Sequence, residues 1–113
     1  LGTTFGGGPM ACAAMEAVLD ALESEKLLDQ VQRVGAYIRE TCVVGPVTGH
    51  QGAGFLTGLR TSRPAKAIQA ELLECGILAG TSADPHVLRL LPAYILEEEH
   101  VDMLRDTLAD LPA

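Results

Sequence analysis

Two stretches with helical spacing of apolar residues come before any strand-like segment, and this order limits the folds open to the chain. In the first stretch Pro9 suits the opening position of a helix, and apolar residues share one stripe: Met10, Ala14, Val18 and Leu22. The small residues at 11–14 predict close packing against another backbone. In the second stretch Ser24 is the expected N-cap, followed by an apolar repeat: Leu27, Val31, Val34 and Ile38. These spacings predict two amphipathic helices.

Short strand-like segments then alternate with two further helices. The expected strands cover residues 42–44, 54–59, 77–79 and 87–91. One helix is expected to open at Arg63-Pro64 and to end before Gly76, a natural C′ residue. The other opens with three glutamates, 97–99, which suit the positive end of the helix dipole, and buries the face of Val101 and Leu104. The order predicts an α+β fold in which helices cover a short, mostly antiparallel sheet.

Composition sets further bounds on size and partners. The 113 residues are 48% hydrophobic but only 4% aromatic, so one domain with an aliphatic core is expected. Fifteen acidic against eight basic residues give a net charge of −7, which argues against a nucleic-acid partner. Apolar runs stay shorter than a membrane span needs, and the sequence opens without a signal peptide. We therefore expect no membrane partner.

Cysteine and histidine spacing indicates neither a disulfide framework nor a metal site. Cys12, Cys42 and Cys75 lie about thirty residues apart with no CxxC pair, a pattern that favours a reducing cytoplasm. Their expected role is that of small buried hydrophobes. The histidines stand singly, none at ligand spacing from another histidine or cysteine: His50, His86 and His100. No metal is assigned.

The opening segment is the first candidate site. Thr3 and Thr4 precede three consecutive glycines and a helix start. Hydroxyl groups, glycine N–H groups and a helix N-terminus together favour an anion such as phosphate. The segment matches neither a P-loop nor a GxGxxG turn, so a flexible connection into the helix is the alternative.

Arg89 is the second candidate, because it interrupts an otherwise apolar run, Val-Leu-Arg-Leu-Leu-Pro. A buried guanidinium needs an anionic partner, and its planar fork matches a carboxylate. The sequence therefore points to a carboxylate ligand. The alternative is an arginine facing outwards from a half-exposed strand, since Leu88 and Leu90 alternate with it.

Three ordered motifs resemble the C-terminal part of the class III aminotransferases, most closely the acetylornithine and ornithine group. The first is Gly-Thr-Thr-Phe-Gly-Gly-Gly-Pro at 2–9, followed by small residues at 11–14. The second is the glycine-punctuated segment 52–59. The third is Val-Leu-Arg-Leu-Leu-Pro at 87–92 with the glutamates at 97–99. The resemblance covers essentially all 113 residues in order.

The resemblance implies a fold-type I enzyme that uses pyridoxal 5′-phosphate. It implies that residues 1–41 hold the cofactor-phosphate loop and a long helix linking a large domain to a small one, and that 42–113 form the C-terminal small α+β domain. Thr4 matches a threonine that reaches the cofactor phosphate of the neighbouring subunit, Thr3 borders the substrate, and Arg89 clamps the substrate carboxylate. The implied enzyme is a homodimer that moves an amino group between an amino acid such as N-acetylornithine or ornithine and 2-oxoglutarate, in a ping-pong reaction.

The sequence also departs from the family pattern. Leu1 replaces the usual histidine, Gly8 the usual asparagine, and Pro92-Ala93 a double proline. The Schiff-base lysine and the acid that pairs with the pyridine nitrogen lie upstream of the Gly-Thr-Thr motif in such enzymes, outside this chain. Neither Lys26 nor Lys66 matches that lysine, so no catalytic residue is assigned and the 113-residue chain is expected to be inactive alone.

Two other functions stay open at this point. One is a stand-alone α+β binding or interaction module, which an open reading frame starting near residue 1 would favour. The other is a fragment of a different class III aminotransferase, acting on a 4-aminobutyrate-like or diamine substrate. Arg89 does not separate these aminotransferases, because each holds a substrate carboxylate.

Overall fold

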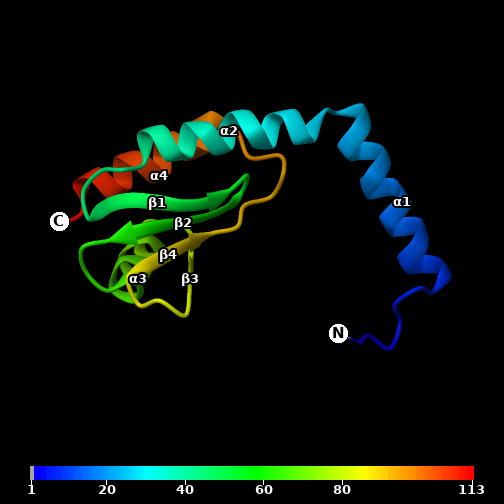
Figure 1. Cartoon of the computed structure of the whole chain (residues 1–113), viewed down its shortest axis with the longest axis horizontal. Helices are drawn as coiled ribbons and strands as arrows, with labels where there is room; N and C mark the ends of the chain where they lie inside the picture. Colours follow the sequence, from blue (N-terminus) through cyan, green and yellow to red (C-terminus); the bar gives the residue numbers. More distant parts are fainter. Residues whose placement is uncertain (1) are drawn as a thin grey trace.

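Four antiparallel strands form a single sheet in the computed structural model, which describes residues 2–113 (Figure 1). The strands are β1 (Val47–Ala53), β2 (Leu56–Thr61), β3 (Gly80–Thr81) and β4 (Val87–Leu90), in the order β1-β2-β4-β3. β1 and β2 make a hairpin, and β4 pairs with both β2 and β3. The helices are α1 (Pro9–Ser24), α2 (Leu27–Thr41), α3 (Ala65–Glu74) and α4 (Glu98–Asp110). The α+β expectation with an antiparallel sheet is confirmed.

The two central strands bury one face, while the other face carries exposed arginines beside one buried residue, Val87. Along β2, Thr57, Leu59 and Thr61 are buried, while Arg60 between them is exposed. On β4, Leu88 and Leu90 are buried on the same side, because strand residues alternate between faces. The buried face packs with side chains of α2, α3 and α4 in an aliphatic core: Val34, Ile38, Ile68, Leu72, Val101, Leu104 and Leu108. The opposite side is called the open face below.

Polar contacts join α2 to α4, which lie side by side over the sheet (Figure 1). The Tyr37 hydroxyl donates a hydrogen bond to Asp102 Oδ1 at 2.7 Å, and Arg105 also donates to that carboxylate. Nearer the start of α2, Gln30 Nε2 donates to the Leu96 carbonyl at 2.9 Å. These contacts hold α2 and α4 in register above the buried face.

α1 projects away from this layer and buries none of its residues within the described chain (Figure 1). The radius of gyration is 16.2 Å, against about 13 Å for a compact domain of roughly 100 residues. The helix itself was expected, but its apolar stripe is exposed here: Met10 and Val18 are largely accessible. The expected close packing of residues 11–14 is therefore absent among residues 2–113.

Some predicted boundaries are wrong for identifiable reasons. Residues 42–44 are not a strand, since Cys42 is the C-cap of α2 and the chain turns at Gly45. β1 instead forms in the glycine-containing stretch that follows, and residues 77–79 precede β3 rather than forming it. Ser24 is the last residue of α1. The N-cap of α2 is Lys26, whose φ of 52° makes the bend between the two helices.

The expectation for the cysteines is right at one position and wrong at two. Cys42 is fully buried, while Cys12 and Cys75 are exposed. Cys12 lies on α1, which buries none of its residues within the described part of the chain, and Cys75 is the C-cap of α3, where the helix leaves the core.

Candidate functional site

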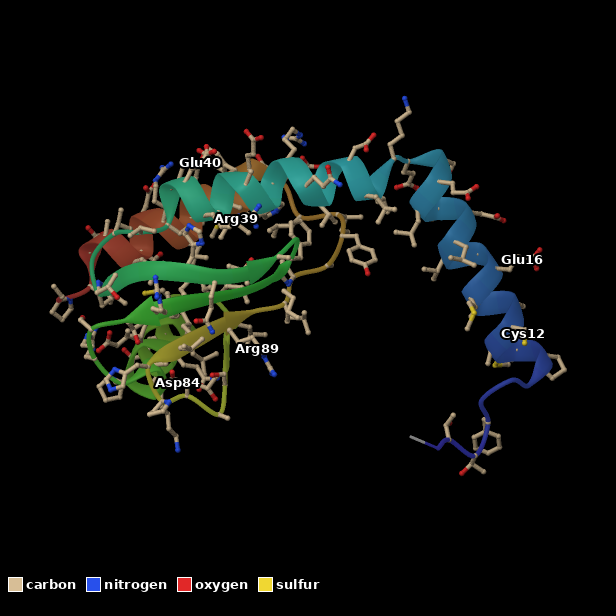
Figure 2. The ribbon with its side chains drawn as sticks, viewed as in Figure 1. Cys12, Glu16, Arg39, Glu40, Asp84 and Arg89 are labelled. Carbon is tan, nitrogen blue, oxygen red and sulfur yellow. The ribbon has the colours of Figure 1, made fainter. Side chains whose placement is uncertain are left out.

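Arg89 lies on the open face of the sheet, between two glycines of the neighbouring strands. Its register partners are Gly58 on β2 and Gly80 on β3. The side chain is exposed and points away from α2 and α4 (Figure 2). Within residues 2–113 no carboxylate forms an ion pair with it. Of the two interpretations of the sequence, the structure agrees with an arginine that faces outwards from the sheet. The exposed guanidinium is therefore available to bind a carboxylate.

A hollow of about 390 Å³ adjoins Arg89 at the β3 edge of the sheet. Its walls come from the segment before β3, the end of β4 and α4, and they are mainly apolar: Ile77, Leu78, Leu90, Leu91, Met103 and Leu104. Gly80 and Arg89 also line it, so the hollow reaches the edge strands that carry the candidate arginine.

The segment 2–8 before α1 presents two hydroxyl groups. Thr3 and Thr4 are exposed, and neither hydroxyl has a hydrogen-bond partner within the described part of the chain. The segment folds back on itself: a Cβ at Gly6 would come 2.3 Å from Thr3 Cγ2, and Gly7 has a φ of 78°. The glycines at these two positions thus let the segment turn into the helix.

The donors in this segment fit a phosphate group. Gly8 is the N-cap of α1 and offers no side chain to the first N–H groups of the helix, which leaves these donors for an anion. Thr4 lines an open hollow at this end of α1 together with Phe5 and the glycines. Hydroxyl and backbone N–H donors are a common phosphate-binding set. Leu1, which stands where the family has histidine, lies outside the described residues.

The structure does not bring the two candidate groups together. Thr4 and Arg89 line separate hollows, and the N-terminal segment lies at the far end of α1 from the sheet (Figure 1). Neither lysine lines these two hollows. Lys26 occupies the bend between α1 and α2, and Lys66 lies exposed in the first turn of α3.

The perturbed pKa values belong to contacts that hold the fold together. Hydrogen bonds from Arg63 lower the pKa of Glu71, and the two side chains pair through both guanidinium Nη atoms. A hydrogen bond to Asp102 raises the pKa of Tyr37, and burial raises the pKa of the Cys42 thiol. These groups join helices and loops around the core, so they explain stability rather than chemistry at Arg89.

Residues 2–113 contain neither a metal-binding cluster nor a membrane-spanning helix. These residues contain no group of three or more His, Cys, Asp or Glu side chains placed to hold a metal ion. None of the described helices is long and apolar enough to cross a membrane.

The sequence similarity of the chain to known proteins shows its family. The family "Aminotransferase class-III" matches residues 1–111. The chain belongs to this family. Class III aminotransferases are pyridoxal phosphate enzymes, so the expected family and its cofactor are confirmed.

Similar curated proteins include the acetylornithine aminotransferase 1 of Bordetella bronchiseptica, which is 39% identical over an alignment of 108 residues that covers 91% of this chain and 27% of that protein. The acetylornithine aminotransferase of Streptomyces coelicolor is 42% identical over 105 residues, covering 89% of this chain and 26% of the relative. The chain thus spans about a quarter of the length of these relatives.

Solved aminotransferase structures share the fold. The acetylornithine aminotransferase of Elizabethkingia anophelis matches 96% of this chain and 32% of its own with a TM-score of 0.80 and 28% identity. An ornithine aminotransferase of Toxoplasma gondii, with pyridoxal phosphate at partial occupancy in its active site, matches 96% of this chain and 28% of its own with a TM-score of 0.78 and 27% identity.

Gly80 is the residue beside Arg89 that sequence reasoning missed. A lone glycine next to a predicted strand signals a close approach of another group, but nothing in the sequence says which group. The approaching group is Arg89 itself, whose Nε would lie 3.2 Å from a Cβ at position 80.

Proposed function

We propose that this chain is the C-terminal part of an aminotransferase that moves an amino group between N-acetylornithine or ornithine and 2-oxoglutarate. The family match supports the reaction class, and the named relatives support the amino donor. The observation on this chain that carries the proposal is the exposed Arg89 on the open face of the sheet, which forms no ion pair with a carboxylate of residues 2–113. In the proposed enzyme it binds the carboxylate that all these substrates share.

Each proposed residue has one task in the reaction. Arg89 donates two parallel N–H bonds to the substrate carboxylate and so fixes the orientation of the amino-bearing carbon. The Thr4 hydroxyl donates a hydrogen bond to a phosphate oxygen of the cofactor of the neighbouring subunit, and Thr3 borders the substrate. When bound, pyridoxal phosphate supplies the electron sink for chemistry at that carbon.

The proposal divides the chain at residue 41. Residues 1–41 carry the phosphate-contacting segment and the two helices that link a large domain to the small one, and 42–113 form the small domain. The exposed apolar stripe of α1 supports this division, because such a surface needs a covering partner. We infer that the covering surfaces belong to the rest of the enzyme and to a second subunit of a homodimer. The unpaired cysteines support a cytoplasmic location.

Substitutions in the complete enzyme test the site. Arg89→Ala is expected to weaken substrate binding by about 2–5 kcal/mol, which is roughly 30-fold or more in KM, with little change in cofactor retention. Thr4→Ala is expected to weaken cofactor retention, so that the enzyme loses cofactor more easily on dialysis, with little change in substrate binding. Arg60→Ala is the matched control, since Arg60 is another exposed arginine of the open face without an ion pair in residues 2–113. Equal KM values for Arg89→Ala and Arg60→Ala would overturn the role of Arg89.

The length of the natural polypeptide separates the enzyme from a stand-alone module. Since 108 residues are 27% of the Bordetella protein, that relative has about 400 residues. At the mean residue mass of this chain, a protein of that length weighs about 42 kDa. An antibody against this chain should detect a band of that size in source cells. A sole band near 12 kDa would favour the module.

A further inference from the structure

Two arginines of the open face lie over glycines of the adjacent strand. Arg60 on β2 pairs in register with Gly49 on β1, and Arg89 on β4 pairs with Gly80 on β3. A Cβ at Gly49 would come 2.6 Å from Arg60 Nη2. A Cβ at Gly80 would come 3.2 Å from Arg89 Nε and 3.3 Å from Arg89 Nη2. In both pairs the guanidinium occupies space that any other residue would fill.

The backbone does not require glycine at either position. Neither Gly49 nor Gly80 has a positive φ, so an alanine would meet no conformational strain there. Side-chain space is the remaining reason for glycine at these positions. At Gly80 that space is taken by the guanidinium that the proposed function assigns to the substrate carboxylate.

We propose that Gly80 is a positioning residue for Arg89. The bare backbone at Gly80 lets the guanidinium lie against β3, which fixes the direction in which its N–H groups meet a substrate carboxylate. This inference rests on the proposed function of Arg89. In this inference Gly80, on β3, does not contact the substrate. It acts only by positioning the Arg89 side chain.

A small shift of the guanidinium should matter for binding. Carbon and nitrogen atoms in ordinary contact lie about 3.5–4.0 Å apart, so an alanine at 80 displaces the fork by a few tenths of an ångström. Bidentate pairing with a carboxylate depends on the direction of both N–H groups. A misplacement of about 1 Å costs on the order of 100-fold, so the smaller shift predicts a rise in KM of about three- to tenfold.

The experiment compares Gly80→Ala with Gly49→Ala in the complete enzyme. Gly49→Ala is the matched control, because it presses a Cβ against Arg60, an arginine with no proposed task. KM for the amino acid and for the oxo acid, kcat and the thermal midpoint are measured for both variants. Gly80→Ala is expected to raise both KM values with kcat nearly unchanged, while Gly49→Ala leaves KM unaltered.

A second pair of variants tests whether the effect passes through the guanidinium. Lysine has no planar fork, so Gly80→Ala is expected to change KM less than twofold when Arg89→Lys is already present. An unchanged KM in Gly80→Ala, or the same rise in the Arg89→Lys background, would overturn the positioning role. If Arg89→Ala leaves KM unchanged, the proposed function itself fails. A raised KM in Arg89→Ala with a normal KM in Gly80→Ala rejects only this inference.

Discussion

At the scale of single residues, burial decides which reactive groups are available. Arg89 interrupts an apolar run whereas Cys42 directly follows Arg-Glu-Thr, yet the first is exposed and the second fully buried. The difference comes from position: Arg89 is on the open face of β4, and Cys42 caps α2 against the core. An apolar neighbourhood in sequence therefore does not determine exposure.

The thiols of this chain should differ in reactivity for the same reason. Burial raises the pKa of the Cys42 thiol, and the thiolate is the reactive form. With an aromatic disulfide reagent at pH 8, Cys12 and Cys75 are expected to react within minutes and Cys42 only after denaturant is added. Peptide mass spectrometry of the labelled chain identifies the sites. Three equal rates would contradict the burial of Cys42.

At the scale of elements, strand pairing overrides local preference. β1 carries glycines that disfavour a strand, but its residues pair with β2 in a hairpin, and that pairing supplies the backbone hydrogen bonds.

The turn that leads from α2 into β1 depends on Gly45. Its φ is 54°, and a Cβ there would come 1.9 Å from the Leu108 carbonyl oxygen of α4. The end of α2 and the end of α4 therefore meet at a position that accepts only glycine.

Gly45→Ala should destabilise the chain more than Gly76→Ala does. Both glycines have a positive φ, but the space around Gly76 is open. Gly76→Ala is expected to cost about 1–2 kcal/mol of unfolding free energy from backbone strain alone. Gly45→Ala adds a backbone clash, for a total of about 3 kcal/mol or more. Urea unfolding followed by circular dichroism measures both, and equal midpoints for the two variants would refute the contact with α4.

At the scale of the whole molecule, the chain consists of a packed layer and a helix without a partner. The layer buries an aliphatic core, whereas α1 buries nothing and exposes Met10, Met15 and Val18. A 16-residue helix that contacts only the start of the next helix and buries none of its residues is only marginally stable in water. The long first helix therefore depends on surfaces that residues 2–113 do not supply.

Hydrogen exchange should separate the two parts. In the 113-residue chain, α1 amides are expected to exchange at least about 100-fold faster than those of α2, because local opening of α1 exposes no core. In the complete enzyme, where the proposal covers α1, its amides should become protected. Mass spectrometry of peptic peptides from both proteins makes the comparison. Equal protection of α1 in the two proteins would contradict the proposed covering surfaces.

The amino-acid sequence by itself determined the α+β class, the existence of the four helices and the order of the three family motifs. Helical spacing is a local property, so Leu27 to Ile38 identify a helix without any knowledge of its neighbours. The motifs likewise identify Thr3, Thr4 and Arg89 as candidate site residues without the tertiary structure. Their roles in catalysis stay predictions.

Tertiary structure alone decided the sheet order, the strand β1, the exposure of α1 and the placement of Arg89 over Gly80. Each of these depends on residues that are distant in sequence and meet only after the chain has folded. Pairing energy in a sheet comes from the neighbouring strand, and burial comes from whatever covers a surface. The local spacing of residues contains information on neither strand pairing nor burial. The contact between Arg89 and Gly80 therefore follows only from the pairing of β3 with β4.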